Sequence, residues 1–124
     1  MFADVTQLVG IELVNVDSSG ANVGDYDNDG WLDLCITYHN APTLLYHNNR
    51  NGTFTKMDGA AGVVGTNSGS TSFVDYDNDG DLDLYVANDF GRNNLYRNEG
   101  GPEPGGRSEP GSRIFRDVAA EAGV

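Results

Sequence analysis

A doubled aspartate-rich loop constrains this chain more than any other feature of its sequence. The segment DYDNDGWLDL begins at Asp25, and DYDNDGDLDL begins fifty positions later at Asp75. In each copy, carboxylates stand at positions 1, 3, 5 and 9 around a glycine at position 6. Carboxylates at this density repel one another unless a cation lies among them. The repeated pattern therefore indicates two metal-binding loops.

Loop geometry and ligand chemistry favour Ca²⁺ as the metal. Side chains at alternate positions of a tightly curled loop converge on one point, and Gly30 and Gly80 allow the sharp turn in its middle. The residue at position 7, Trp31 or Asp81, can add its backbone carbonyl. All-oxygen sites of this charge suit Ca²⁺, because Mg²⁺ takes fewer protein ligands and Zn²⁺ prefers His or Cys. The alternative, a solvated Asp-Asn-Gly turn, explains a single copy better than two copies in register.

The residues that follow each loop argue against an EF-hand. An EF-hand closes with a glutamate at position 12 and lies between two helices, whereas position 12 here is Ile36 or Val86. In segments 32–37 and 82–87, branched or aliphatic residues recur at every second position. This period of two predicts β-strands. Each loop is therefore predicted to join two strands, with Asp33 and Asp83 supplying the closing carboxylate.

The acidity of the chain is largely a property of these loops. The formal charge is −12, and nine of the 19 acidic residues lie in the two loops. Two bound Ca²⁺ ions reduce this charge to −8. An acidic chain argues against nucleic acid and anionic membranes as partners, because both attract Lys and Arg. No apolar run reaches the roughly 18 residues of a membrane span, and residues 1–5 carry no signal-peptide pattern.

Matching segments outside the loops reveal a repeat with a period near fifty residues. Residues 45–48 (LYHN) match residues 95–98 (LYRN), and a Phe-led closing motif ending in Gly-Ile or Gly-Val recurs at 2–11, 54–63 and 115–124. Several short strands per unit at this period predict propeller blades. The predicted fold is all-β: two four-stranded antiparallel repeats forming a partial β-propeller, with calcium loops between the first and second strands. The predicted strands cover residues 21–24, 31–38, 43–47 and 53–57, then 71–74, 81–88, 94–97 and 113–118.

The repeat divides a chain of 124 residues, at most one ordinary domain by length, into three parts. Residues 1–11 are predicted to be the closing strand and turn of a preceding blade, 12–63 the first repeat and 64–124 the second. Short helical turns are expected within 4–9 and 117–122, and the Gly- and Pro-rich stretch 99–112 is a predicted loop insertion. Two blades leave two faces bare. We therefore expect a fragment of a longer propeller or, next, a self-associating unit.

Four other side chains can be interpreted from their positions in the repeat. Cys35, the single cysteine, is predicted to be a buried strand residue and cannot form an intrachain disulfide. His39 and His47 follow predicted strands without a further metal-ligand pattern, so both are interpreted as polar surface or turn residues. Trp31 either packs on the next blade or is exposed for a partner, and the sequence leaves both possibilities open.

Together these motifs resemble a known family. The succession of DxDxDGxxDL, LYxN, GTF and a closing Gly-Ile or Gly-Val is similar to the FG-GAP/VCBS repeat, which builds the integrin α-subunit propeller and many bacterial secreted proteins. The version with Phe-x-Asp-Val resembles repeats of the ASPIC/UnbV and cartilage acidic protein group, although Lys56 replaces the aspartate in the middle copy. The resemblance implies the following calcium ligands: Asp25, Asp27, Asp29, Asp33 and the carbonyl of Trp31, then Asp75, Asp77, Asp79, Asp83 and the carbonyl of Asp81.

The resemblance also implies a function. Proteins of this family are mostly extracellular or periplasmic and act in protein or glycan recognition and adhesion, so the chain is predicted to be a non-enzymatic, calcium-stabilised module. An alternative is a polysaccharide-active lyase or hydrolase, because paired carboxylates can perform acid–base chemistry. Against it, nine aspartates are committed to metal and no nucleophile motif occurs. A calcium sensor of the EF-hand type is a third possibility, and it requires helices.

Overall fold

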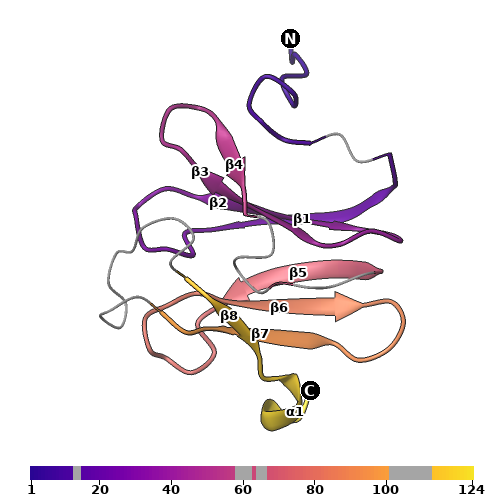
Figure 1. Ribbon diagram of the computed structural model, residues 1–124, viewed down its shortest axis with the longest axis vertical. Helices are drawn as coiled ribbons and strands as arrows, with labels where there is room; N and C mark the ends of the chain where they lie inside the picture. The colour runs from indigo at the N-terminus through magenta and orange to yellow at the C-terminus, as the bar shows by residue number, and fades with distance from the viewer. Residues whose placement is uncertain (13–14, 58–62, 64–66, 101–112) are drawn as a thin grey trace.

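Two four-stranded antiparallel sheets make up most of the chain in the computed structural model (Figure 1). The structure describes residues 1–12, 15–57, 63, 67–100 and 113–124. Each sheet keeps its strands in chain order, so that consecutive strands are neighbours. The first sheet contains β1 (Ser18–Gly24), β2 (Asp33–Tyr38), β3 (Leu44–Asn48) and β4 (Phe54–Lys56). The second contains β5 (Ser68–Val74), β6 (Asp83–Asn88), β7 (Asn94–Asn98) and β8 (Phe115–Asp117), and helix α1 (Ala119–Ala122) follows it.

The predicted all-β fold is confirmed, and each of the eight predicted strands overlaps an observed strand. Strands β1 and β5 begin three residues earlier than predicted, at Ser18 and Ser68. These early residues are serine and glycine, which provide no alternating apolar signal in the sequence. They become strand residues because they pair with β2 and β6, with a register shift after Ser18 and after Ser68 that is typical of a β-bulge.

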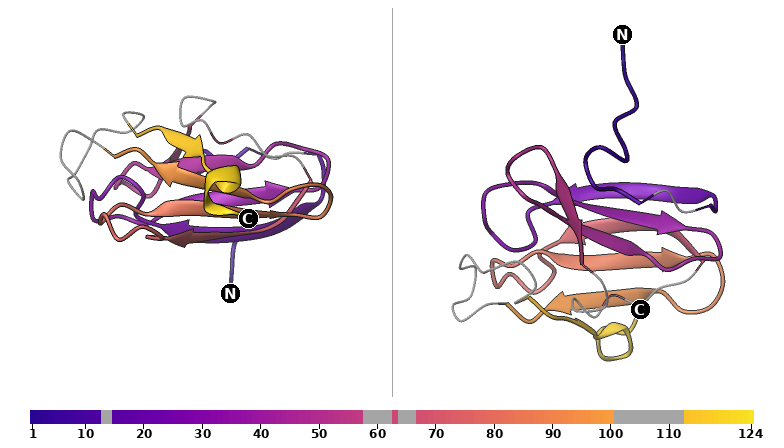
Figure 2. Two further views of the ribbon diagram at one scale, coloured as in Figure 1. Left: turned by 90° about the horizontal axis from the view of Figure 1, so that it is seen from below. Right: turned by 45° about the horizontal axis from the view of Figure 1, so that its top comes forward.

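The two sheets stack face to face, with the first above the second in Figure 1 and in the right view of Figure 2. The main core lies between them. Each sheet thus covers an apolar face of the other, as consecutive repeats of an array do. Cys35 is buried as predicted, and burial raises the pKa of its thiol to about 12. Both sheets contribute residues to the core, which contains Tyr26, Cys35, Leu45, Leu84, Val86, Tyr96 and Phe115.

A glycine on β1 allows the sheets to approach closely. A Cβ at Gly24 would lie 2.7 Å from two ring atoms of Phe73 on β5, well inside van der Waals contact. A hydrogen bond crosses the same interface, because Nδ2 of Asn22 donates to the carbonyl of Thr71 at 3.0 Å. In the second repeat, Val74 stands at the position of Gly24, and it is 41% exposed. The part of β5 that corresponds to the contacting part of β1 is therefore not covered by another sheet.

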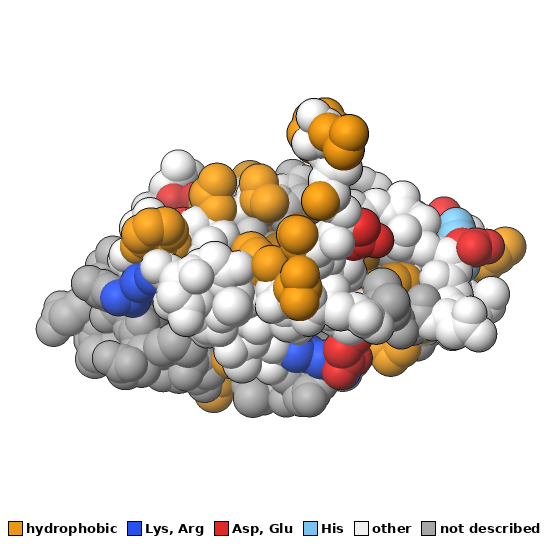
Figure 3. All heavy atoms as spheres, turned by 90° about the horizontal axis from the view of Figure 1, so that it is seen from above, with side chains coloured by type: hydrophobic (Ala, Val, Ile, Leu, Met, Phe, Trp, Pro, Cys, Tyr) orange, Lys and Arg blue, Asp and Glu red, His pale blue; other side chains and the backbone are white. Residues whose placement is uncertain are grey.

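The faces turned away from the interface are partly bare. Figure 3 views the molecule from above the first sheet and shows hydrophobic side chains spread over this side. Val23 on β1 is 55% exposed and Trp31 is 49% exposed. Trp31 therefore takes the exposed arrangement of the two that the sequence allowed. On the second sheet, Leu95 forms a smaller buried cluster with Val118 and Ala119, so the chain around α1 covers part of its outer face.

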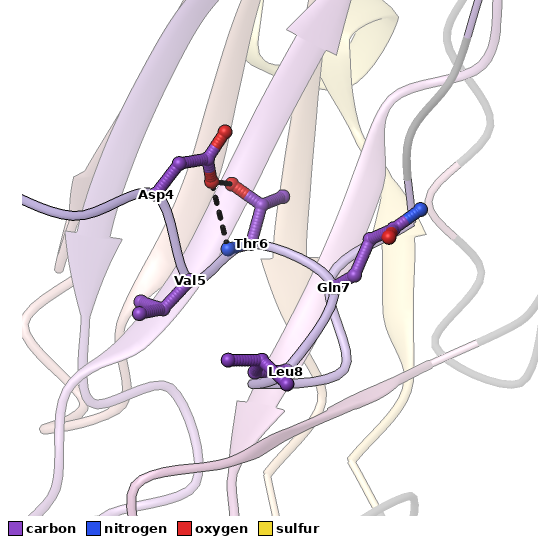
Figure 4. A pocket seen from close by; sticks show the side chains of 5 residues that line it. All are labelled: Asp4, Val5, Thr6, Gln7 and Leu8. Carbon is purple, nitrogen blue, oxygen red and sulfur yellow. Dashed lines mark hydrogen bonds between the residues drawn. The ribbon is translucent and has the colours of Figure 1, made fainter.

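The chain ends lie outside the two sheets. Residues 1–5 form no strand, and Phe2 is fully exposed. A turn follows, in which Oδ1 of Asp4 accepts hydrogen bonds from the backbone N and Oγ1 of Thr6 at 3.0 and 2.6 Å (Figure 4). None of the described residues belongs to a helix long and apolar enough to cross a membrane. Of the predicted insertion, residues 101–112 lie outside the described residues.

Candidate metal centres

The two aspartate loops are bends between adjacent strands. The first loop (residues 25–33) leads from β1 into β2, and the second loop (residues 75–83) leads from β5 into β6. They lie next to each other, because Nδ2 of Asn28 donates to Oδ1 of Asp81 at 2.8 Å. Gly30 and Gly80 have φ values of 90° and 92°, which residues with a Cβ rarely adopt. The position-6 glycines therefore allow the sharp turn that the sequence predicted.

Hydrogen bonds from the backbone to two carboxylates curl each loop. In the first loop, Asp25 accepts from the backbone N of Asp29 at 2.9 Å and of Gly30 at 2.8 Å. Asp29 in turn accepts from the backbone N of Trp31 at 2.8 Å. The second loop repeats these three bonds with lengths of 3.1, 3.1 and 2.9 Å. The two loops thus share one local structure, which follows from their shared sequence.

The carboxylate at position 9 closes each loop from the first residue of a strand. Asp33 accepts from the backbone N of Tyr26 at 3.2 Å and of Asn48 at 2.8 Å. The equivalent bonds to Asp83 measure 3.0 and 2.8 Å. Both carboxylates are buried, and this burial raises the pKa of Asp33 to about 7 and that of Asp83 to about 6, although the backbone hydrogen bonds act in the opposite direction. A nearby cation would offset the cost of burying these charges.

Each loop brings carboxylate oxygens within reach of a single ion. One oxygen from each of Asp25, Asp27 and Asp29 lies within 4.8 Å of the others. The same limit holds in the second loop for Asp75, Asp77 and Asp83. Oxygens at such separations can share one divalent cation at the 2.3–2.6 Å typical of calcium. Asp79 belongs to neither group of three, and its Oδ1 accepts the Asp81 backbone bond described above.

The clearest sign of a cation site is the carboxylate of Asp27. This residue is fully buried, and among the described residues neither of its oxygens makes a hydrogen bond, although Oδ2 lies 3.2 Å from Nδ1 of His47. Burial, together with the charge of nearby Asp29, raises the pKa of Asp27. Buried polar atoms in folded proteins are almost always paired. The orphaned oxygens therefore fit a bound cation, and the donor sets of both loops fit one.

At position 7 the two loops differ. Only the backbone carbonyl was predicted to bind metal here, and the side chains have other surroundings. The carboxylate of Asp81 is buried, and its Oδ1 lies 2.5 Å from a guanidinium nitrogen of the buried Arg113. The same oxygen accepts the bond from Asn28 of the first loop. The Asp81 side chain thus joins Asn28 of the first loop to Arg113. Trp31, at the same position of the first loop, is exposed instead.

His47 was predicted to be a polar surface or turn residue, and this prediction is wrong. The side chain is 6% exposed, and its Nδ1 lies 3.2 Å from Oδ2 of Asp27 and 3.3 Å from Oδ1 of Asp33. Strand β3 places it there, because the next residue, Asn48, donates its backbone N to Asp33. His39 does lie at the surface, 3.2 Å from Asp89. The replacement of His47 by Arg97 in the second repeat was the one signal in the sequence.

Arg50 is a second residue that sequence reasoning missed. Its guanidinium makes two contacts with Oδ2 of Asp29, at 2.8 Å from Nε and 2.7 Å from the terminal nitrogen. Burial by itself would raise the pKa of Asp29, but the bonds from Arg50 and the Trp31 backbone lower it below its usual value. Gly100 stands at the equivalent position of the second repeat. The first loop therefore has His47 and Arg50 as neighbours, whereas the second loop has Arg113 beside Asp81.

Comparison with known protein families identifies the repeat. The FG-GAP-like repeat family matches residues 25–86, which is 62 of the 124 residues. The matched segment begins at the first loop and ends within β6, so it contains both loops. No curated protein matches the chain. Half of the chain, including both candidate metal centres, carries the family pattern, and the chain belongs to the FG-GAP-like repeat family.

Proposed function

We propose that this β-propeller repeat module binds calcium in both loops and serves protein or glycan recognition outside the cytoplasm, without catalytic activity. The observation that carries the proposal is the group of carboxylates in the second loop, because one oxygen from each of Asp75, Asp77 and Asp83 lies within 4.8 Å of the others. In the first loop, the buried Asp27 carboxylate accepts no hydrogen bond among the described residues and adds a second candidate site. Oxygen ligands alone select Ca²⁺ over softer metals.

Calcium in this arrangement is structural. An ion bound to the second loop holds Asp75 at the end of β5 and Asp83 at the start of β6, and therefore stabilises the bend between the two strands. At a free concentration of 100 times the dissociation constant, one site stabilises the folded state by about 2.7 kcal/mol. Loops without the position-12 carboxylate of an EF-hand belong with extracellular calcium modules, whose dissociation constants are about 10⁻⁴–10⁻³ M. This range supports a protein that works where calcium is abundant.

Asp77→Asn is expected to abolish the calcium-dependent part of stability contributed by the second loop. Asp77 is exposed and belongs to the group with Asp75 and Asp83, so its charge serves the ion more than the fold. Thermal unfolding followed by circular dichroism should show a melting temperature about 10 °C lower than wild type in millimolar calcium. In chelator the two proteins should melt together.

The matched control is Asp17→Asn, which removes one exposed negative charge outside the loops. It should melt like wild type in both buffers. Equal losses for Asp77→Asn with and without calcium would mean that Asp77 supports the fold directly, and the calcium proposal for this loop would be wrong.

The partners proposed for the bare faces are further repeat units, either in a longer chain or in a second copy. The first sheet already binds the second through such a face, and Val23 and Val74 occupy exposed positions on the two outer sides. Light scattering in millimolar calcium should give a mass above the 13.3 kDa of one chain. Val23→Lys should shift the mass towards that of the monomer, whereas Phe90→Lys, an exposed residue between β6 and β7, should not. A monomeric wild type that unfolds cooperatively would contradict the proposal that the bare faces bind further repeat units.

The absence of catalysis is likewise a proposal. It is supported by the roles already assigned to the carboxylates of the loops, which accept loop backbone bonds or group around a common point. Acid–base catalysis on a sugar needs a pair of carboxyl groups facing the scissile bond. Cleavage of an acidic polysaccharide by the purified protein would favour the alternative, a lyase or hydrolase.

A further inference from the structure

We propose that the first loop binds a transition-metal ion of the zinc class in preference to calcium, through Nδ1 of His47 together with Asp27 and Asp33. This inference deepens the proposed function, since it rests on the first loop being a metal site, and it separates the two loops by the metal they select. The geometry that carries it is a buried donor set of one imidazole nitrogen and two carboxylates.

The distances suit a small ion. The Nδ1 atom of His47 lies 3.2 Å from Oδ2 of Asp27 and 3.3 Å from Oδ1 of Asp33. Two donors bound to a tetrahedral zinc ion at 2.0–2.1 Å lie about 3.3 Å apart. The side chains of His47, Asp27 and Asp33 are between 0% and 6% exposed, so the donors share an enclosed site.

The nitrogen makes no hydrogen bond among the described residues, and its neighbours are two carboxylate oxygens at ion-pair distance. Among the described residues, Nδ1 of His47 and both oxygens of Asp27 lack a hydrogen-bond partner, although these atoms lie close together. A buried polar atom without a partner is costly, and a bound ion would satisfy all three at once. Coordination through Nδ1 leaves the imidazole proton on Nε2.

Arg50 reduces the suitability of this loop for calcium. Its guanidinium binds Oδ2 of Asp29, the carboxylate at position 5. Calcium takes six to eight oxygens, whereas zinc takes four ligands and accepts imidazole nitrogen. With Asp29 engaged, the grouped donors that remain are the nitrogen of His47 and the carboxylates of Asp27 and Asp33. This smaller, mixed set matches the zinc class.

The second loop provides an internal comparison. At the position of His47 it has Arg97, which pairs with Glu99 at 2.8 Å, and at the position of Arg50 it has Gly100. Its three grouped donors, Asp75, Asp77 and Asp83, are all carboxylates. The two copies of the repeat therefore contain one site with a nitrogen donor and one without. The two sites are expected to prefer different metals.

The test is titration of the full chain with Zn²⁺, Co²⁺ and Ca²⁺, each added alone to metal-free protein. Calorimetry should give one Zn²⁺ site that binds at least about 100-fold more tightly than calcium, as expected for a nitrogen-containing site late in the Irving–Williams order. Co²⁺ should produce the visible absorption bands of a low-coordinate site. His47→Asn puts an amide oxygen near the position of Nδ1 and should weaken Zn²⁺ binding by about 100-fold. Removing a residue that only supports a metal ligand already costs about 10–100-fold, and His47 is proposed to bind the metal directly.

Two matched variants complete the experiment. His39→Asn removes the other of the two histidines, which lies at the surface beside Asp89, and should leave zinc and cobalt binding unchanged. Asp77→Asn in the second loop should also leave them unchanged. His47→Asn should still be stabilised by calcium, which shows that it is folded. Zinc binding that persists in His47→Asn, that is lost in His39→Asn, or that is no tighter than calcium binding in wild type would overturn the inference.

These outcomes separate the inference from the proposed function. Calcium binding at both loops with no zinc preference would leave the proposed function intact and refute the inference. Zinc binding that depends on His47, without calcium binding at either loop, would support the inference and refute the calcium proposal.

Discussion

Removing calcium at pH 7.5 is expected to lower the melting temperature of the wild-type protein by about 10–20 °C. Two sites, each saturated at about 100 times its dissociation constant, contribute about 5 kcal/mol together. That amount is comparable with the whole stability of many small domains. Without the ion, the buried carboxylates of Asp27, Asp33 and Asp83 have no divalent cation to offset their desolvation. Calorimetric scans of metal-free protein, with and without added calcium, measure the difference.

Two controls make the experiment specific. Magnesium at the same concentration should restore much less of the stability, because it takes few all-protein oxygen cages. The double variant Asp27→Asn/Asp77→Asn, changed once in each loop, should melt at the same temperature with and without calcium. Identical melting of the wild type in calcium and in chelator would contradict the structural role proposed for the ions.

In the metal-free protein, stability is expected to fall as the pH rises from about 4 to about 7.5. Burial raises the pKa of Asp33 to about 7 and that of Asp83 to about 6, from an ordinary value of 3.8. Between those values the folded state holds protons that the unfolded state releases. The stabilisation from these groups is therefore complete below pH 3.8 and is lost as the pH rises through 6 and 7. Urea unfolding at several pH values should show a lower free energy of unfolding at pH 7.5 than at pH 4.

Calcium should reverse this trend, because the ion binds the ionised carboxylates. The increase in melting temperature on adding calcium should therefore be larger at pH 7.5 than at pH 5. Asp33→Asn cannot titrate at this position, so its metal-free stability should change less over the same pH range than that of wild type. A metal-free wild type that becomes more stable between pH 5 and pH 7.5 would show that these two carboxylates do not control the pH dependence.

Most of the fold could be predicted from local sequence. The loops recur because DYDNDG places backbone N–H groups against the carboxylates at positions 1 and 5, and these contacts span at most five residues. The strands follow from alternation, which is also a local property. Strands β1 and β5 began earlier than predicted because serine and glycine give no such signal, and only pairing with a neighbouring strand makes them extended.

The candidate site was predictable only in part, because its two distinguishing residues are distant from the loop in sequence. His47 lies 14 positions after Asp33 and Arg50 lies 21 positions after Asp29. A histidine on a strand reads as a surface residue when no second ligand stands near it. Strand β3 must pair with β2 before His47 meets Asp27 and Asp33.

Sequence alone was sufficient to define the doubled aspartate loops, the short strands around them and the family, because each depends on contacts between residues a few positions apart. The assembled sheets decided the environment of each loop. Packing of the second sheet on the first placed Asn28 against Asp81, and strand pairing enclosed His47 among carboxylates. Burial and charge come from neighbours that chain order does not reveal, so two nearly identical loops of sequence became two chemically different sites.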